Sequence, residues 1–383
     1  MAWTTVAWAC GCGRRNTTVD SAGIIGCSMA ITVRRWDDPA SWNQFVASTP
    51  CAHFQQSWEW GELAPQLGGR AVRLAALHDG TIAAAMQLFI NPLSRTRKTH
   101  LYVPRGPAIS EASIKILGPL LDSARLLGEE EDSVGIRLEP NAADCSASWK
   151  ASLSALGLRP IFPPSQPRSS WVLDISLDLD VLLANMKQKT RYNIRLAGRK
   201  GVEVIEGSEH DLDAFYELYR ETGERDDFLI LPKSLYARMF DLFRQAGNFS
   251  MLLARYRGQL IAAVTLLRFG STCWYLHGAS SNEHRNLMAT YLLQWEGIRW
   301  AKEQGCTLYD FRAIPDVLRE DQDMYGVYRF KEGFGGRKVT TLHTYAAPYQ
   351  SGVFGLWQMY FSGRFALTNW MRRRKGLPVR QFA

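Results

Sequence analysis

The chain has 383 residues, of which 46% are hydrophobic and 21% are charged. A chain of this length favours two domains, and its composition excludes long disordered regions. The formal net charge of +8 at pH 7 indicates polyanionic partners such as tRNA, nucleotide-linked precursors or anionic lipid surfaces, although many mildly basic proteins bind no polyanion. Much of the excess charge lies in residues 364–380, which contain no Asp or Glu.

Seven cysteines are scattered through the chain, and an odd, scattered set is typical of reduced thiols in the cytosol. Cys10 and Cys12 are too close together for a usual zinc half-site, so we expect no metal. No apolar run approaches the roughly 20 residues that a membrane span needs, and residues 1–28 lack the basic-then-apolar order of a signal peptide. We therefore expect a cytoplasmic protein in which residues 1–28 are a loose extension or a start-site artefact.

The first half predicts helices alternating with strands, from Asp/Pro helix starts and from alternating apolar residues around a His-Asp-Gly turn. The expected elements are a strand over 31–36, a helix over 37–49, two strands within 71–90, a helix over 111–130, a strand over 133–140 and a helix over 146–157.

A Pro-rich stretch at 160–170 predicts the crossing between domains, and a similar order of elements follows it. We expect a strand over 171–178, a helix over 178–201, a strand over 202–207, helices over 211–224 and 234–247, three strands within 249–280, a helix over 288–305 and a strand over 307–314. Each half thus has helices, a hairpin-rich sheet and a further helix, which predicts a mixed α+β fold duplicated in architecture.

Short motifs from residue 56 to residue 336 occur in an order and spacing that resemble one family. They lie at 56–60, 102–107, 166–168, 187–195, 201–202, 224–228, 275–280, 309–312 and 325–336. Together they are similar to the Fem (FemABX) family of non-ribosomal peptidyltransferases. The resemblance implies two domains of the GNAT (acyl-CoA N-acyltransferase) type.

The resemblance also implies a division of labour between these domains. Residues 29–168 with about 335–350 would form a first domain on the precursor side, and 169–334 a second on the aminoacyl-tRNA side. The implied activity is transfer of an amino acid from aminoacyl-tRNA to the stem peptide of a peptidoglycan precursor, either UDP-MurNAc-pentapeptide or a lipid-linked form. No cofactor is expected.

The segment 324–336, MYGVYRFKEGFGG, carries the candidate catalytic residues. Its glycines predict a tight turn with exposed amides, and in an extended segment Phe330 and Lys331 would point to opposite faces. An aminoacyl ester is already activated, so the enzyme needs a positioned amine and a positive group beside the developing oxyanion. The resemblance implies this role for Lys331, with Phe330 beside it. An ordinary surface lysine in a turn is the alternative.

The predicted helix after the crossing is strongly basic. Lys187, Arg191 and Arg195 follow one another at intervals of four, on one face, and Tyr192 and Asn193 could bond bases or sugars. We expect this face to bind phosphates of tRNA or of a nucleotide diphosphate. A solvated basic face is the alternative.

Other candidates lie in the remaining motifs. Arg105, Tyr275 and Tyr328 fall in the resembling segments and are expected to bind substrate. Asp310 and Asp316 flank the end of a predicted strand, where a carboxylate could receive the proton of the attacking amine or cap the following turn.

Two rival functions are weighed against the transferase. The first is a GNAT-type N-acyltransferase that uses acyl-CoA on a small molecule. Against it, Met288 and Thr290 replace the small residues of the GNAT pyrophosphate loop and would crowd a phosphate. The second is a non-enzymatic binder of envelope components or nucleic acid, which the Phe330-Lys331 motif disfavours.

The C-terminal segment 351–383 places six aromatic residues ahead of a basic cluster. Aromatic residues beside cations suit a peripheral contact with the inner face of a membrane. The alternative is a helix packed on the first domain with a solvated basic end.

Overall fold

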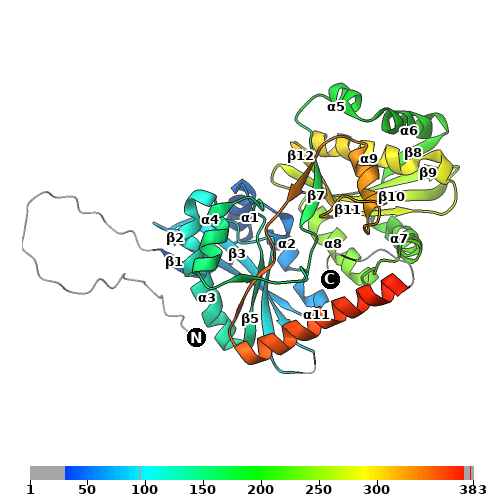
Figure 1. The fold of residues 1–383 in the computed structure, drawn as a ribbon. Helices are drawn as coiled ribbons and strands as arrows, with labels where there is room; N and C mark the ends of the chain where they lie inside the picture. Colours follow the sequence, from blue (N-terminus) through cyan, green and yellow to red (C-terminus); the bar gives the residue numbers. More distant parts are fainter. Residues whose placement is uncertain (1–30, 95, 375–379, 381–383) are drawn as a thin grey trace, which may run out of the picture.

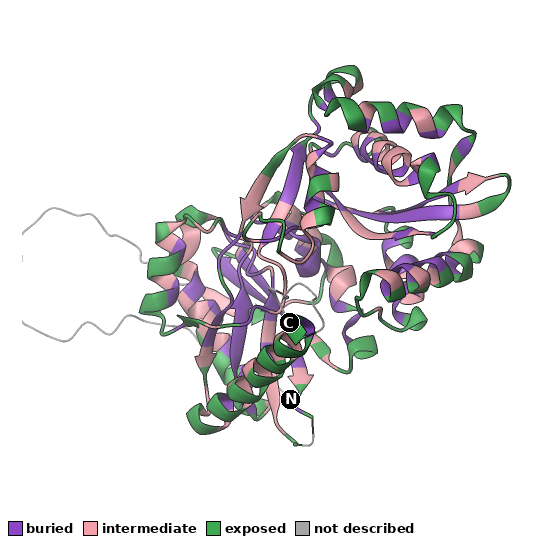
Figure 2. Ribbon diagram, turned by 45° about the vertical axis from the view of Figure 1, so that its right-hand side comes forward, coloured by how far each residue is buried: buried purple, intermediate pink, exposed green. Residues whose placement is uncertain are grey.

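The structure is a computed structural model that describes residues 31–94, 96–374 and 380. The extension expected at residues 1–28 lies outside this range. The described residues form two seven-stranded sheets, each flanked by helices, and Figure 1 shows the sheets beside each other with a long C-terminal helix running along both. This arrangement confirms the predicted mixed α/β fold. Figure 2 shows buried strands inside each layer and exposed helix surfaces outside.

The first sheet contains strands from the N-terminal half and one late strand. Its order is β1 (Thr32–Arg35), β2 (Arg70–His78), β3 (Thr81–Pro92), β4 (Thr99–Pro104), β5 (Ser133–Glu139), β14 (Tyr345–Pro348) and β6 (Arg159–Pro160). The accompanying helices are α1 (Pro39–Ser48), α2 (Trp58–Gly61), α3 (Leu117–Glu130) and α4 (Ala147–Ala155).

The second sheet is built from the remaining strands. Its order is β13 (Arg337–Thr340), β7 (Ser169–Asp174), β12 (Leu308–Ala313), β11 (Thr272–Ser280), β10 (Gln259–Phe269), β9 (Phe249–Tyr256) and β8 (Val202–Glu206). Its helices are α5 (Leu179–Asn185), α6 (Gln188–Arg199), α7 (Leu212–Asp226), α8 (Lys233–Gln245), α9 (Ala289–Glu303) and α10 (Tyr325–Glu332).

The two halves share one plan. Each sheet has a parallel pair, β4 with β5 and β11 with β12, while the other described ladders are antiparallel. A parallel pair needs a long crossover, which α3 supplies in the first sheet and α9 in the second. The architecture is therefore duplicated, as the element order predicts.

The long helix predicted over 178–201 is wrong, because it is two helices that break at Met186 and Lys187. The Arg191 guanidinium donates to the carbonyl oxygens of Ala184 and Met186, which satisfies acceptors left at the end of α5. The Lys187 N–H donates to the Gly333 carbonyl oxygen at 2.9 Å. The break therefore lets α6 begin against the end of α10.

The tight turn predicted for 324–336 is also displaced. Residues 325–332 form α10, and the turn follows it at Gly335 and Gly336, whose φ angles are 85° and 97°. A Cβ at Gly336 would lie 2.3 Å from the Val172 carbonyl oxygen, so the glycine allows the chain to pass close to β7.

The boundary expected at about 335 lies further along the chain. Strand β13 still pairs with β7 of the second sheet, whereas β14 pairs with β5 and β6 of the first. The chain therefore returns to the first domain between residues 340 and 345.

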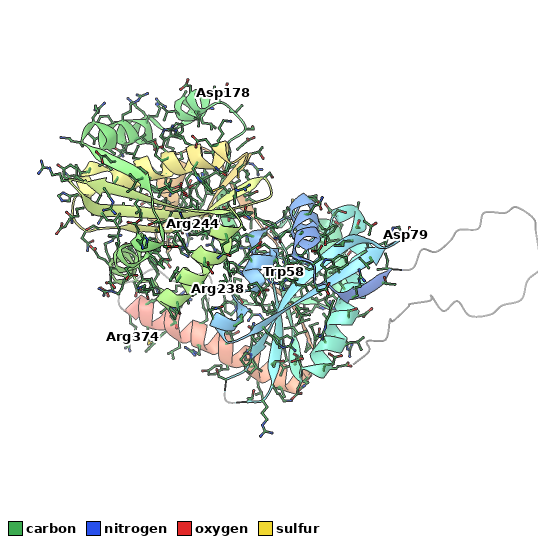
Figure 3. All side chains as sticks on the ribbon, turned by 180° about the vertical axis from the view of Figure 1, so that it is seen from behind. Trp58, Asp79, Asp178, Arg238, Arg244 and Arg374 are labelled. Carbon is green, nitrogen blue, oxygen red and sulfur yellow. The ribbon has the colours of Figure 1, made fainter. Side chains whose placement is uncertain are left out.

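An apolar cluster joins the two domains. Trp42 and Phe54 of the first domain share it with Phe215, Phe243 and Trp274 of the second, and the Phe54 and Trp274 rings are 5.1 Å apart. In Figure 3, α8, which carries Arg238 and Arg244, lies next to the first domain and Trp58. Burial of these large side chains fixes the relative positions of the domains.

Candidate active site between the two sheets

A cavity of about 380 Å³ lies where the two sheets meet. Its first-domain wall comes from the chain before α2, from the turn after β4 and from the chain after β5, while β7, β11, β12 and β13 form the opposite wall. The functional side chains on these walls are His53, Arg105, Asn141, Arg168, Asp310 and Arg312.

Lys331 lies against the wall of this cavity and contacts the backbone of two residues that line it. Its side chain is only 3% exposed, and Nζ donates to the carbonyl oxygens of Arg312 at 3.3 Å and Ala313 at 2.7 Å, both cavity-lining residues at the end of β12. Burial lowers the pKa of Lys331 to about 7, against the opposing effect of the Asp310 charge. The amine therefore exchanges its proton near neutral pH, as a general acid or base requires.

Asp310 and Arg312 bring opposite charges to the cavity. Burial raises the pKa of Asp310, although the Arg312 N–H, which donates to its Oδ1 at 2.6 Å, and nearby cations oppose that shift. Arg312 has a φ of 61°, an uncommon conformation for a non-glycine residue. Asp310 and Lys331, both candidates from the sequence, thus lie near one another, with Arg105 on the facing wall.

Phe330 lines a second cavity, of about 480 Å³, on the other side of α10. This cavity lies at the beginning of α9 and is also lined by Met288, Thr290 and Tyr291. The Phe330 and Tyr291 rings are 5.0 Å apart. Phe330 and Lys331 therefore face different surroundings, as expected, but they do so from a helix and not from an extended segment.

The two tyrosine candidates have different surroundings from Lys331. Tyr275 packs against the core of the second domain, where burial raises its pKa to about 12. Tyr328 is buried against Trp171, with ring centroids 5.4 Å apart. Neither side chain lines the two cavities above.

The basic face is smaller than the spacing suggests. Lys187 precedes α6 and pairs with Glu332 at 2.7 Å, Arg191 is occupied by backbone carbonyls, and Asn193 is buried. The predicted contact of Asn193 with bases or sugars is therefore wrong, whereas ligand binding by Lys187, Arg191 and Arg195 stays a prediction. Tyr192 and Arg195 are exposed on α6 and remain open to a ligand.

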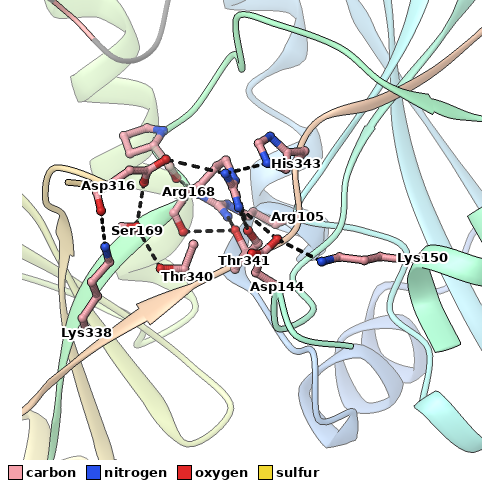
Figure 4. Close-up of polar contacts among 11 residues, drawn as sticks. Arg105, Asp144, Lys150, Arg168, Ser169, Asp316, Lys338, Thr340, Thr341 and His343 are labelled. Atoms are coloured by element: carbon pink, nitrogen blue, oxygen red, sulfur yellow. Dashed lines mark hydrogen bonds and ion pairs between the residues drawn. The ribbon is translucent and has the colours of Figure 1, made fainter. Parts of the chain in front are cut away.

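Asp316 belongs to a polar network that ties the two domain crossings together (Figure 4). Its Oδ1 accepts from the Ser169 hydroxyl at 2.6 Å, and Arg168 lies 3.7 Å from Oδ2. Arg168 also pairs with Asp144 at 3.0 Å, and Arg105 donates to the Thr341 hydroxyl at 2.8 Å. The network places Asp316 in a structural role at the cavity edge.

His53 is a cavity residue that the sequence reasoning missed. Its ring lies 5.1 Å from that of Trp274, and burial lowers its pKa well below the usual value, so the ring is neutral. Its Nδ1 accepts from the Gln55 N–H at 3.1 Å. Its position three residues before the motif beginning at Gln56 was the available signal. Within the described residues, no group of three or more His, Cys, Asp or Glu could hold a metal ion.

Comparisons with known proteins agree with a division into two domains. A model of the FemAB family matches residues 38–155, and a model of the acetyltransferase (GNAT) domain matches residues 184–332. A Lipid II:glycine glycyltransferase of Staphylococcus aureus (strain MRSA252) is 25% identical over 365 residues, covering 76% of this chain and 87% of the relative. The corresponding protein of strain COL is 24% identical over the same shares.

Solved structures show the same fold. A crystal structure of FemX superposes with a TM-score of 0.79 at 22% identity, covering 85% of this chain and all of the other. A tandem GNAT protein from the clavulanic acid biosynthesis pathway gives a TM-score of 0.50 at 10% identity, covering 83% of this chain and 98% of the other. The non-enzymatic alternative is therefore wrong: the chain is a transferase built from two GNAT-like domains, and its first domain is similar to the FemAB family.

Proposed function

We propose that the protein transfers an amino acid from an aminoacyl-tRNA to the stem peptide of a peptidoglycan precursor and so builds an interpeptide bridge. The observation that carries this proposal is the buried Lys331 ammonium beside Asp310 at the wall of the interdomain cavity. The names of the Lipid II:glycine glycyltransferases support the acceptor class. Because tRNA is a cytosolic molecule, the proposed reaction takes place in the cytoplasm.

The reaction needs little beyond positioning and charge. The acceptor amine attacks the ester carbonyl, a C–N bond forms, and the C–O bond to the tRNA ribose breaks. The amine loses a proton and the leaving ribose oxygen gains one. Two of the three Nζ–H groups of charged Lys331 are directed at carbonyl oxygens, which leaves one to stabilise the oxyanion and protonate the leaving oxygen. Asp310 is proposed to take the amine proton.

The donor is assigned to the second domain. The cavity lined by Phe330 and Tyr291 would hold a terminal base of the tRNA, because base and aromatic rings stack favourably, and the aminoacyl ester would extend to Lys331 at the interdomain cavity. Helix α6 packs against α9, and the first residues of α9 line the cavity beside Phe330. The exposed side chains of Tyr192 and Arg195 therefore lie on the same side of the second domain as that cavity. We propose that these two residues contact the tRNA backbone or its bases, with Lys187 contributing only if its pair with Glu332 opens.

The acceptor is assigned to the interdomain cavity. Arg105 and Arg168 line its wall, where a guanidinium can pair with a phosphate or a carboxylate of the precursor. Tyr275 and Tyr328 are proposed to act indirectly, because both pack behind the cavity walls and would keep β11 and α10 in position.

A transfer assay tests this function. Purified protein would be mixed with a charged tRNA pool and with either a lipid-linked or a UDP-linked precursor, and the modified stem peptide would be identified by mass spectrometry. We expect transfer with an intact aminoacyl ester and none with deacylated tRNA. Transfer from acetyl-CoA to a small amine, with none from any aminoacyl-tRNA, would replace the proposal by the acyl-CoA alternative.

A further inference from the structure

Helix α11 (Ser351–Arg374) connects the surfaces of both domains (Figure 1). Near its beginning, Phe354 is buried against the first sheet, and the Trp357 ring lies 4.6 Å from that of His100. Near its end, buried Arg372 pairs with Asp227 after α7 and with Asp323 at 3.8 Å. The helix is therefore anchored at both ends, and its orientation on the molecule is fixed.

The face of α11 that points away from the protein is apolar. Met359 is 67% exposed and Trp370 is 52% exposed, and Figure 2 shows exposed surface along the whole helix. Helices on protein surfaces usually turn polar residues outward, so this pattern is inverted. The outward apolar residues lie on one face of the helix in two groups, separated by exposed Gly363 and Arg364. The apolar residues are Leu356, Met359, Tyr360, Leu367, Trp370 and Met371.

The charges of α11 are all positive. The helix contains four Arg and no Asp or Glu. Of these, Arg364, Arg373 and Arg374 are exposed, and the Arg374 guanidinium lies 4.5 Å from the centre of the Trp370 ring. Aromatic rings that are flanked by cations suit the boundary between lipid headgroups and acyl chains.

A loop of the second domain extends this surface. Leu229, in the loop after α7, is 86% exposed, and its neighbours Phe228 and Leu231 are also exposed. The loop begins beside Asp227, which holds Arg372. Arg374, at the far end of α11, lies under the second domain in Figure 3. The loop therefore lies next to the C-terminal end of α11.

We propose that α11 and the loop 228–231 form a docking face for a bilayer that contains anionic phospholipid. In the part of the chain that the structure describes, no helix is long and apolar enough to cross a membrane, so the contact is parallel to the surface. The inference deepens the proposed function, because a docked enzyme would meet a lipid-linked acceptor. Docking itself needs no turnover and can be measured separately.

Vesicle co-sedimentation of the full chain tests the docking face. We expect binding to vesicles of phosphatidylglycerol and phosphatidylcholine, weaker binding to phosphatidylcholine alone, and release by high salt. Leu367→Glu should weaken binding at least tenfold, because it places a charge on the apolar face of α11. The matched control is Leu126→Glu on α3, since Leu126 is 50% exposed and Leu367 is 54% exposed. A triple change of Arg364, Arg373 and Arg374 to Gln should cost about fivefold per residue.

Three outcomes would overturn the docking face. The full chain could fail to bind anionic vesicles, or Leu367→Glu could bind as well as the control while both variants melt like the wild type. Light scattering could also find a dimer that Leu367→Glu dissociates, with no vesicle binding, so that a second copy covers the helix. A Leu367→Glu protein that loses vesicle binding but still transfers to a UDP-linked precursor would support the docking face, because docking would then be separate from catalysis.

Discussion

The positive charge on Lys331 should set the rate of transfer, so replacing Lys331 by Met should lower kcat. The side chain keeps its length but loses the N–H group that the two carbonyl contacts leave available. Removing one such donor costs about 100-fold or more in kcat. Because the pKa of Lys331 is about 7, the charged fraction falls from about nine-tenths at pH 6 to about one-tenth at pH 8.

The informative quantity is the ratio of wild-type to Lys331→Met kcat, measured by single-turnover transfer from pH 6 to pH 8. The pH dependence of the acceptor amine is common to both proteins and cancels. The ratio should therefore fall about tenfold over this range. Lys338→Met is the control, since Lys338 also donates to a backbone carbonyl, that of Asp316, but should leave kcat unchanged. A ratio near one, or one that does not change with pH, would refute the reasoning.

The same substitution should stabilise the fold at neutral pH. The pKa of Lys331 is lowered from 10.5 to about 7 by burial, so between these pH values the unfolded chain binds more protons than the folded chain. The free energy of unfolding of the wild type should then rise with pH across this window, and that of Lys331→Met should rise less. Urea denaturation at pH 7 and pH 9 measures both. A Lys331→Met protein that is less stable at pH 7 would contradict the burial cost of the charge.

Further predictions concern the donor, the proton acceptor and the turn after α10. Arg195→Ala should weaken tRNA binding and reduce the slope of log affinity against log salt by about 0.7 to 0.9, whereas an unchanged slope would remove this contact. Asp310→Asn should lower kcat by about 100-fold, and Asp316→Asn should change kcat little; equal losses would reject Asp310 as the base. Gly336→Ala should destabilise the fold by more than about 1 kcal/mol, because the new Cβ would meet a carbonyl oxygen of β7 at a φ of 97°. A Cβ at Gly326 would meet no atom within 4 Å, so Gly326→Ala should stabilise α10 by about 0.5–1 kcal/mol. Thermal denaturation measures both glycine variants, and the opposite order of stability would contradict this reasoning.

Sequence patterns predicted the elements that depend on local periodicity. The hairpin of β2 and β3 turns at Asp79 and Gly80, which both have positive φ, as the His-Asp-Gly sequence predicts. The sequence does not predict α10, because the glycines at 333, 335 and 336 favour a turn over the whole segment, whereas glycine also ends a helix. The break at Lys187 has no Gly or Pro to announce it and depends on a hydrogen bond to Gly333, far along the chain.

The active site was predictable only in part, because some of its contacts join residues that are far apart in the chain. Lys331, Asp310 and Arg105 lie in motifs; the fold brings Asp310 and Arg105 to one cavity and Lys331 against its wall. The pairing of Lys187 with Glu332 and the burial of Asn193 depend on contacts between separate helices. Periodicity places residues on a face of a helix, but it does not tell which face another element covers.

The position of β14 has a consequence for synthesis on the ribosome. This strand lies between β5 and β6 in the first sheet, yet it is translated after the whole second domain. The emerging first domain therefore waits with the edge of β5 unpaired, and such an edge is prone to aggregate. The second domain, from β7 to β13, is continuous in the chain and can fold during this delay. A fragment that ends at residue 168 would lack an interior strand, so the two domains should be separated by excising 169–340 and joining the ends, and not by a single cut.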